Sequence, residues 1–145
     1  MSDKAKVLLT AYKDLDWDTY IGLCDLLTPI HKDTIGNDLA FQASIYSHYS
    51  GLLALSKLEE DKADSKLKRA ESLVISQSEA KLTAKRLDAM VLTSPNVIEA
   101  QEEYFKACYR TELLHSLVKA LDQKKDCLIQ MSSNQRAEIN LYAKG

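Results

Sequence analysis

The feature that most constrains this chain is a long run without a helix breaker, since Asn96 to Lys144 contains no glycine or proline. Small and apolar residues recur through this run at a heptad-like spacing, which is typical of a packed helix. They are Tyr104, Ala107, Thr111, Leu114, Val118, Leu121, Leu128, Gln135 and Tyr142. Ser94 suits an N-cap and Pro95 suits the first helical position. The sequence therefore predicts one helix of about 45 residues, near 70 Å long at 1.5 Å per residue.

Such a helix is long compared with a compact domain of this size, whose radius of gyration is about 15 Å. We therefore expect its apolar stripe to pack against copies of the chain or against a partner. The expected assembly residues are Leu114, Leu117, Val118, Leu121, Leu128 and Met131. Lys124, Lys125 and Asp126 interrupt the stripe, and we interpret them as a solvated face with local ion pairs.

A second long helix is expected to begin after an N-cap at Asn37 or Asp38. Its apolar stripe comprises Leu39, Tyr46, Tyr49, Leu53, Ala63, Leu67, Ala70 and Val74. We interpret Tyr46 and Tyr49 as core residues. Gly51 weakens the helix by about 1 kcal/mol and suggests a close helix crossing.

Shorter helices are predicted around these two. One covers residues 5–14, and another covers residues 16–29 with Asp16 or Asp18 as its cap and Pro29 just after its end. Residues 76–83 read as a loop, followed by a short helix capped by Thr83. The expected fold is all-α: an elongated helical hairpin with a long C-terminal helix, assembling as an oligomeric ring or bundle. We expect an acidic helical segment at residues 1–36 and a helical domain at residues 37–145.

No motif in the sequence points to catalysis, so we expect a protein that is not an enzyme and that needs no metal or cofactor. His31, His48 and His115 are isolated, and no phosphate-binding glycine loop is present. The cysteines Cys24, Cys108 and Cys127 form no CxxC pair, which suits a reducing cytosol. We also expect no membrane span and no signal peptide, and therefore a cytoplasmic protein.

The charge distribution supplies the candidate binding residues. The chain has a net charge of −2, and residues 1–38 carry four basic and seven acidic side chains. Residues 62–86 carry seven basic against three acidic side chains. The basic residues are Lys62, Lys66, Lys68, Arg69, Lys81, Lys85 and Arg86. A ring would repeat this cluster and add phosphate contacts, although cations near a helix C-terminus also balance the helix dipole.

Two stretches carry a resemblance to a known family. They are "HYSGLLALSKLEEDKADSKLKRAESL" and "KLTAKRLDAMVLTSPNVIEAQEEYFKACYRTELLHSLVKALDQKKDCLIQMSSNQRAEI". Together they resemble the UvsY-like phage recombination mediators over residues 38–140, in helix order, spacing and a few residue types. The resemblance implies a homo-oligomer that binds single-stranded DNA. It also implies loading of a RecA-like recombinase in place of a single-strand DNA-binding protein, in a bacterial host cytosol.

Carried onto this chain, the family's DNA-contacting motif falls on Lys66, Lys68 and Arg69, and its assembly helix falls on the C-terminal helix. The chain departs from the family in two places. No aromatic residue closely follows the Lys-Leu-Lys-Arg stretch, which puts base stacking in doubt, and the acidic first 36 residues have no clear counterpart. The alternative is a helical structural or assembly-scaffold protein without nucleic-acid binding.

Overall fold

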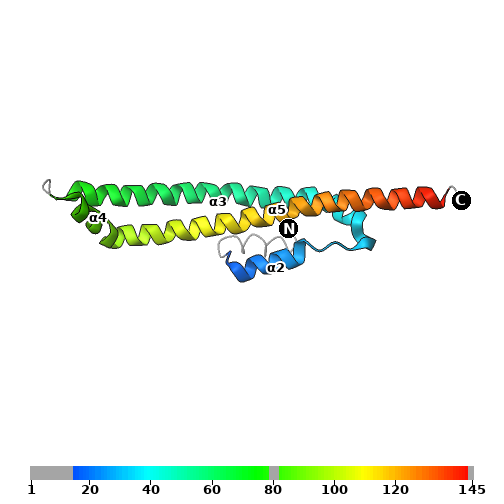
Figure 1. Ribbon diagram of the computed structural model, residues 1–145, viewed down its shortest axis with the longest axis horizontal. Helices are drawn as coiled ribbons and strands as arrows, with labels where there is room; N and C mark the ends of the chain where they lie inside the picture. Colours follow the sequence, from blue (N-terminus) through cyan, green and yellow to red (C-terminus); the bar gives the residue numbers. More distant parts are fainter. Residues whose placement is uncertain (1–14, 79–81, 144–145) are drawn as a thin grey trace. The chain divides into compact units, whose positions relative to one another are not determined.

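The computed structural model describes residues 15–78 and 82–143, and the described residues are almost entirely helical without any strand. The elements in chain order are α2 (Trp17–Leu27), the 3-10 helix η1 (Lys32–Thr34), α3 (Ile35–Gln77), α4 (Ala84–Thr93) and α5 (Pro95–Tyr142) (Figure 1). The predicted all-α class and the long C-terminal helix are confirmed. The helix predicted at residues 5–14 lies outside the described residues.

The short helix α2 begins and ends where local signals predicted. The carboxylate of Asp16 accepts a hydrogen bond from the backbone N–H of Thr19 at 2.8 Å, as an N-cap does. At the other end, the hydroxyl of Thr28 donates to the carbonyl of Cys24 at 2.7 Å, and Pro29 follows. The prediction of Asp16 as one of two candidate caps is confirmed.

The start of α3 was predicted wrongly. The helix begins at Ile35, so Asn37 and Asp38 lie within its first turn. The 3-10 turn leads directly into the helix, and the hydroxyl of Thr34 lies 3.1 Å from a carboxylate oxygen of Asp38. Ile35 is only 3% exposed. Burial of that side chain favours a helix start at this residue, and the sequence pattern did not show this burial.

The starts of the later helices agree with the predictions, whereas α3 continues to Gln77, two residues into the predicted loop. Thr83 occupies the N-cap position of α4, although its side chain makes no capping hydrogen bond. Pro95 is the first residue of α5, and the carbonyl of Ser94 accepts the N–H of Ile98 at 3.0 Å. Proline suits this position because its missing N–H would have no partner in the helix.

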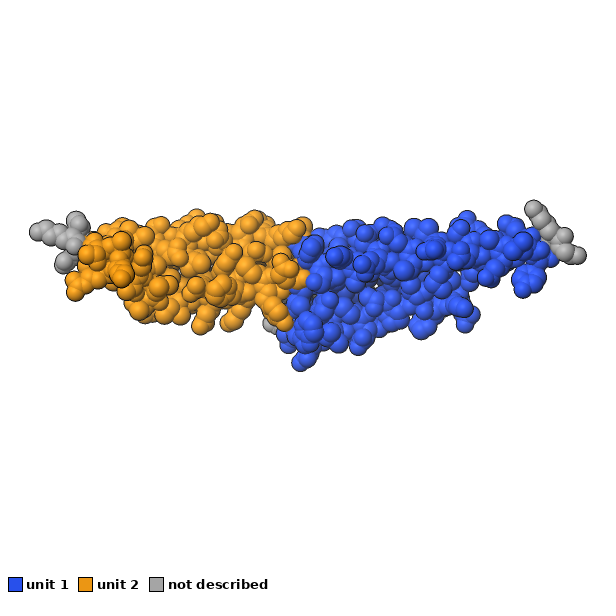
Figure 2. Space-filling model, in the orientation of Figure 1, with its two compact units in different colours: residues 1–53, 113–145 blue, residues 54–112 orange. Residues whose placement is uncertain are grey.

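The chain divides into two compact units, which Figure 2 shows in different colours. Unit 1 comprises residues 1–53 and 113–145, and unit 2 comprises residues 54–112. The helices α3 and α5 contribute to both units. The predicted boundary between residues 36 and 37 falls in the first turn of α3, and a separate role for the acidic segment stays a prediction.

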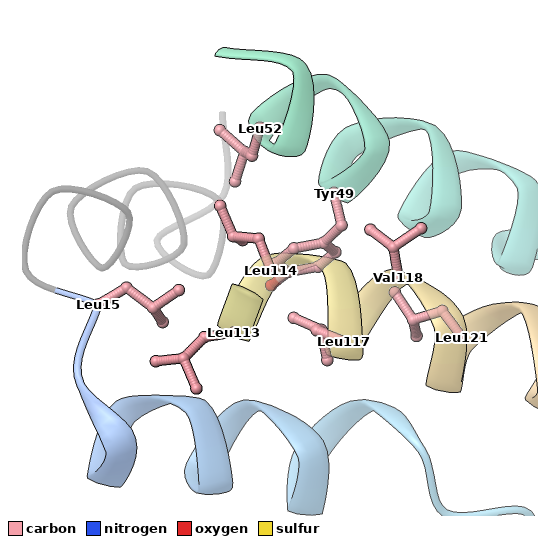
Figure 3. Packing of buried hydrophobic residues seen from close by; sticks show 8 residues of the cluster. All are labelled: Leu15, Tyr49, Leu52, Leu113, Leu114, Leu117, Val118 and Leu121. Atoms are coloured by element: carbon pink, nitrogen blue, oxygen red, sulfur yellow. The ribbon is translucent and has the colours of Figure 1, made fainter. Parts of the chain in front are cut away.

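Unit 1 contains an apolar core between α2, α3 and α5 (Figure 3). Its buried members are Leu15, Tyr49, Leu52, Leu113, Leu114, Leu117, Val118 and Leu121. Tyr20, Leu23 and Leu27 of α2 pack against this cluster, as does Tyr46 of α3. The prediction that Tyr46 and Tyr49 are core residues is confirmed.

Most of the predicted assembly residues lie inside this chain's own structure. Leu114, Leu117, Val118, Leu121 and Leu128 are at most 9% exposed, and Met131 is half-buried. The expectation that copies of the chain or a partner cover the stripe is wrong for these positions, because α2 and α3 supply the opposing surface for much of it. Their apolar character therefore needs no second copy, and assembly itself stays a prediction.

Polar side chains add specific contacts between the helices of unit 1. The buried amide of Gln42 on α3 donates to the carbonyl of Leu121 at 2.7 Å. The ammonium of Lys124 donates to the carbonyl of Leu27 at 2.8 Å and so caps the C-terminal end of α2. Lys125 makes the predicted local ion pair, 2.6 Å from a carboxylate oxygen of Asp122.

Gly51 does not mark a close helix crossing, contrary to the prediction. It is exposed within α3, and a Cβ added there would meet no atom of the described residues within 4 Å.

We expect Gly51→Ala to raise the free energy of unfolding by about 1 kcal/mol, because alanine loses less backbone entropy in a helix. Urea unfolding of the wild type and the variant measures this free energy of unfolding. A decrease in stability would show that the position is crowded after all.

Tyr49 gives a second stability prediction. Its side chain is 2% exposed, and its hydroxyl has no hydrogen-bond partner among the described residues. We expect Tyr49→Phe to stabilise the protein at pH 7 by about 1 kcal/mol, because it removes an unsatisfied buried hydroxyl. The exposed Tyr142→Phe is the control, since the side chain of Tyr142 is 88% exposed. Destabilisation by Tyr49→Phe would instead indicate that the hydroxyl is bonded.

The buried phenol of Tyr49 also leads us to expect a loss of stability at alkaline pH. Burial raises the pKa of Tyr49 from 10.0 to about 12. Between these values the unfolded chain releases the phenol proton while the folded chain retains it, so the stability of the wild type falls as the pH rises. Tyr49→Phe should lack this part of the loss. Equal pH dependence in the two proteins, measured by urea unfolding from pH 9 to 12, would contradict the assignment.

Candidate functional site

Unit 2 is built on an antiparallel pairing of α3 and α5 that polar contacts hold in register. The hydroxyls of Ser56 and Thr111 lie 3.0 Å apart in a buried position. A guanidinium nitrogen of Arg110 lies 2.9 Å from a carboxylate oxygen of Glu59. These cross-helix contacts determine which side chains of α5 face the basic residues of α3.

The basic residues of α3 do not form a single cluster. Lys62, Lys66 and Arg69 follow one another at steps of four and three, so they share one face of the helix. Together with Asp61 and Ser65 they line an open, shallow depression on the surface of unit 2. We call these three residues the cationic face. Lys68 comes two residues after Lys66, about 200° further around the helix, and lies off this face.

Lys66 and Lys68 each already have a carboxylate partner. The ammonium of Lys66 donates to both carboxylate oxygens of Glu103 on α5, at 2.7 and 2.9 Å. The ammonium of Lys68 lies 2.5 Å from a carboxylate oxygen of Asp64, one turn earlier on α3. From the sequence, Asp64 was expected as a nearby acid that balances these residues, whereas Glu103 was not expected.

These ion pairs are exposed to solvent and therefore weak. The side chains of Lys66 and Lys68 are 56% and 70% exposed. The hydrogen bonds to Glu103 and to Asp64 raise the pKa of Lys66 and of Lys68 above 10.5, so both lysines are charged at neutral pH. Exposed pairs contribute about 1 kcal/mol or less, so a phosphate is able to replace either carboxylate at small cost.

The structure removes one alternative explanation for the basic stretch. Cations in the last turn of a helix balance its dipole, and this effect fades beyond that turn. However, α3 continues to Gln77, eight residues beyond Arg69. The helix dipole therefore does not account for Lys62, Lys66 or Arg69.

The remaining predicted cations lie apart from the cationic face in the sequence. Lys85 and Arg86 are exposed in the first turn of α4, where positive charge opposes the helix dipole. Neither forms an ion pair with another described residue. Lys81 lies outside the described residues. The structure thus brings together Lys62, Lys66 and Arg69, and nothing in it joins them to the cations of α4.

The excess of basic side chains is confined to a small part of unit 2. Over residues 54–112 the sequence holds ten basic and eleven acidic side chains, so unit 2 as a whole is close to neutral. Any anion that binds the cationic face therefore does so through a few direct contacts, and the net charge of the unit does not attract it.

The described parts of the chain offer little support for other kinds of site. Within them, no group of three His, Cys, Asp or Glu side chains is arranged to hold a metal ion. Burial is the main cause that raises the pKa of the Cys108 thiol above 9.0, which keeps it protonated at neutral pH. Over the same residues, no helix combines the length and apolar character needed to cross a membrane.

Comparison with known proteins adds no further constraint on the site. No protein-family model, curated protein or solved structure matches the chain.

Proposed function

We propose that this protein is a recombination mediator that binds single-stranded DNA. In this role it assembles as a homo-oligomer and helps a RecA-like recombinase to replace a single-strand DNA-binding protein. The observation that carries the proposal is the cationic face, which presents Lys62, Lys66 and Arg69 on one exposed side of α3. The resemblance to the UvsY-like mediators independently points to the same stretch of α3.

The mechanism that fits this face is electrostatic. A single strand presents phosphates at regular intervals, and ammonium and guanidinium groups bind them by charge and hydrogen bonding. Phosphate contacts carry no sequence information, so little sequence preference is expected. Arg69 and Lys62 are available without breaking an ion pair to a described residue, whereas Lys66 exchanges Glu103 for phosphate.

One observation favours a second candidate, a scaffold protein that binds other proteins and no nucleic acid. Unit 2 exposes several large apolar side chains, among them Leu58, Leu73 and Phe105. Its overall charge is close to neutral. A scaffold would bind partners through these apolar residues, and its affinity for DNA would be negligible at physiological salt.

The first test is a triple substitution of the cationic face, Lys62, Lys66 and Arg69, by alanine. Binding to a mixed-sequence single strand should weaken, because up to three phosphate contacts are lost. The slope of log affinity against log salt should become less negative by about 2, at about 0.7 per phosphate. Fluorescence anisotropy over a salt series measures both quantities.

The matched control replaces two lysines and one arginine that lie elsewhere: Lys57, Lys119 and Arg136 to alanine. All three are exposed, so the change in total charge is the same. An equal effect of both triple variants would mean that only net charge matters. If neither the wild type nor the variants bind the strand at 50 mM salt, the proposed function fails and the scaffold candidate stands.

The second test concerns Glu103, which holds Lys66 by two hydrogen bonds. Glu103→Gln removes the competing charge, so we expect single-strand affinity to rise by about two- to fivefold, the equivalent of a weak surface ion pair. Glu112→Gln is the control, because it removes the same charge from another exposed position on α5. Equal affinity gains in the two variants would show that Lys66 has no special part.

A further inference from the structure

Unit 2 has an unusual distribution of residue sizes in its described part. Its buried residues are Ser56, Val97, Ala100, Ala107 and Thr111, of which none is larger than valine. Large apolar side chains lie outside instead: Ile98, Phe105 and Tyr109 on α5 are 43%, 58% and 49% exposed. Small residues let two helices approach closely, but they leave little apolar area buried between them.

The exposed residues of α5 form a second stripe beside the buried one. Ala100, Ala107 and Thr111 are separated by seven and four residues, and they face α3. Ile98, Phe105 and Tyr109 repeat the same spacing two residues earlier, which places them about 200° around the helix. We call Ile98, Phe105 and Tyr109 the outer stripe. It faces away from α3, so the contacts of α5 with α3 leave it uncovered.

We propose that the outer stripe is a self-association surface, which pairs antiparallel with the outer stripe of a second copy of this chain. Two-fold antiparallel pairing centred between residues 103 and 104 sets Ile98 of each copy opposite Tyr109 of the other. The two Phe105 rings then pack on either side of the centre. This proposal goes beyond the DNA role and does not depend on it.

The charges beside the outer stripe favour this partner and this direction. Glu102 and Lys106 border the stripe on the same side of α5. In the antiparallel arrangement, Glu102 of each copy lies near Lys106 of the other, which gives two symmetric ion pairs. In a parallel arrangement the borders of the two copies would lie on opposite edges of the interface, so Glu102 of one copy would not meet Lys106 of the other. Because Glu102 and Lys106 balance each other, the border of the stripe carries no net positive charge that would attract a phosphate backbone or an anionic membrane.

The surface area of the outer stripe also suits a weakly associating dimer. Three apolar side chains that are about half exposed supply roughly 300 Å² per chain, and the stems of the flanking polar residues bring the total for two chains to about 1,000 Å². That value lies at the lower end of specific interfaces. We therefore expect dimers to be populated at tens to hundreds of micromolar protein, and the isologous pairing closes at two copies.

The test uses charge reversal in two separate proteins, studied without DNA by sedimentation equilibrium at up to about 300 µM. Glu102→Lys alone places Lys opposite Lys106, and Lys106→Glu alone places Glu opposite Glu102. Each variant should associate at least fivefold more weakly than the wild type. An equimolar mixture should regain association, because each copy then meets the opposite charge across the interface.

Glu102 and Lys106 are also one turn apart on α5, so each substitution also changes the charge pairing within its own chain. Mixing the two variants restores only the pairing between chains, and so it separates the two effects. A control mixture of Glu138→Lys with Lys119→Glu reverses exposed charges in unit 1 and should leave association at the wild-type level in each variant and in the mixture. Phe105→Ser should also weaken association, whereas Leu73→Ser, exposed on α3, should not.

Three results would overturn the proposal: a wild type that is monomeric at 300 µM, single variants that associate like the wild type, or a mixture that stays monomeric. Circular dichroism of each variant checks that the helices remain folded. A monomeric wild type would also contradict the homo-oligomer of the proposed function. None of these results bears on DNA affinity, so the salt titration distinguishes failure of this surface from failure of DNA binding.

Discussion

The structure depends first on the burial of the leucine stripe of α5 within unit 1. Leu114, Leu117 and Leu121 are at most 1% exposed, and they meet side chains of both α2 and α3. Burying a leucine side chain contributes about 1.5–3 kcal/mol, so this cluster is the main apolar contribution in the described structure. It also explains the place of Lys124, which caps α2 once that helix lies against α5.

Unit 2 uses a different physical solution for the same two helices. Small buried residues replace the leucines, and the register is carried by the Ser56–Thr111 hydrogen bond and by the ion pairs of Glu59 and Lys66. Such polar contacts contribute little net stability but are specific in their geometry, because an unpaired buried hydroxyl is costly. Large apolar side chains consequently remain at the surface of unit 2, where they are available for binding.

Local signals made the starts of α2 and α5 predictable, whereas the start of α3 and the tertiary contacts did not follow from the sequence. Asp16 and Pro95 mark helix starts because a cap acts on neighbouring backbone groups. The stripe of α5 was also recognised, but its partner was not, since periodicity indicates that a face is buried and not what covers it. The same limit applies to the cationic face: Asp64 and Lys68 are one turn apart and could be paired from spacing, but Glu103 reaches Lys66 only through the register of α3 on α5.

The two surfaces proposed on unit 2 are compatible, because the outer stripe lies on the side of α5 that faces away from α3, which carries the cationic face. Glu103, which marks the edge beside the cationic face, precedes Phe105 by two residues and so lies about 200° away around the helix. Pairing through the outer stripe would therefore leave Lys62, Lys66 and Arg69 open to solvent in both copies. A dimer would then present two cationic faces to one strand. The second face would bind at a high effective concentration, so that weak phosphate contacts on a nearly neutral unit would add up to useful affinity.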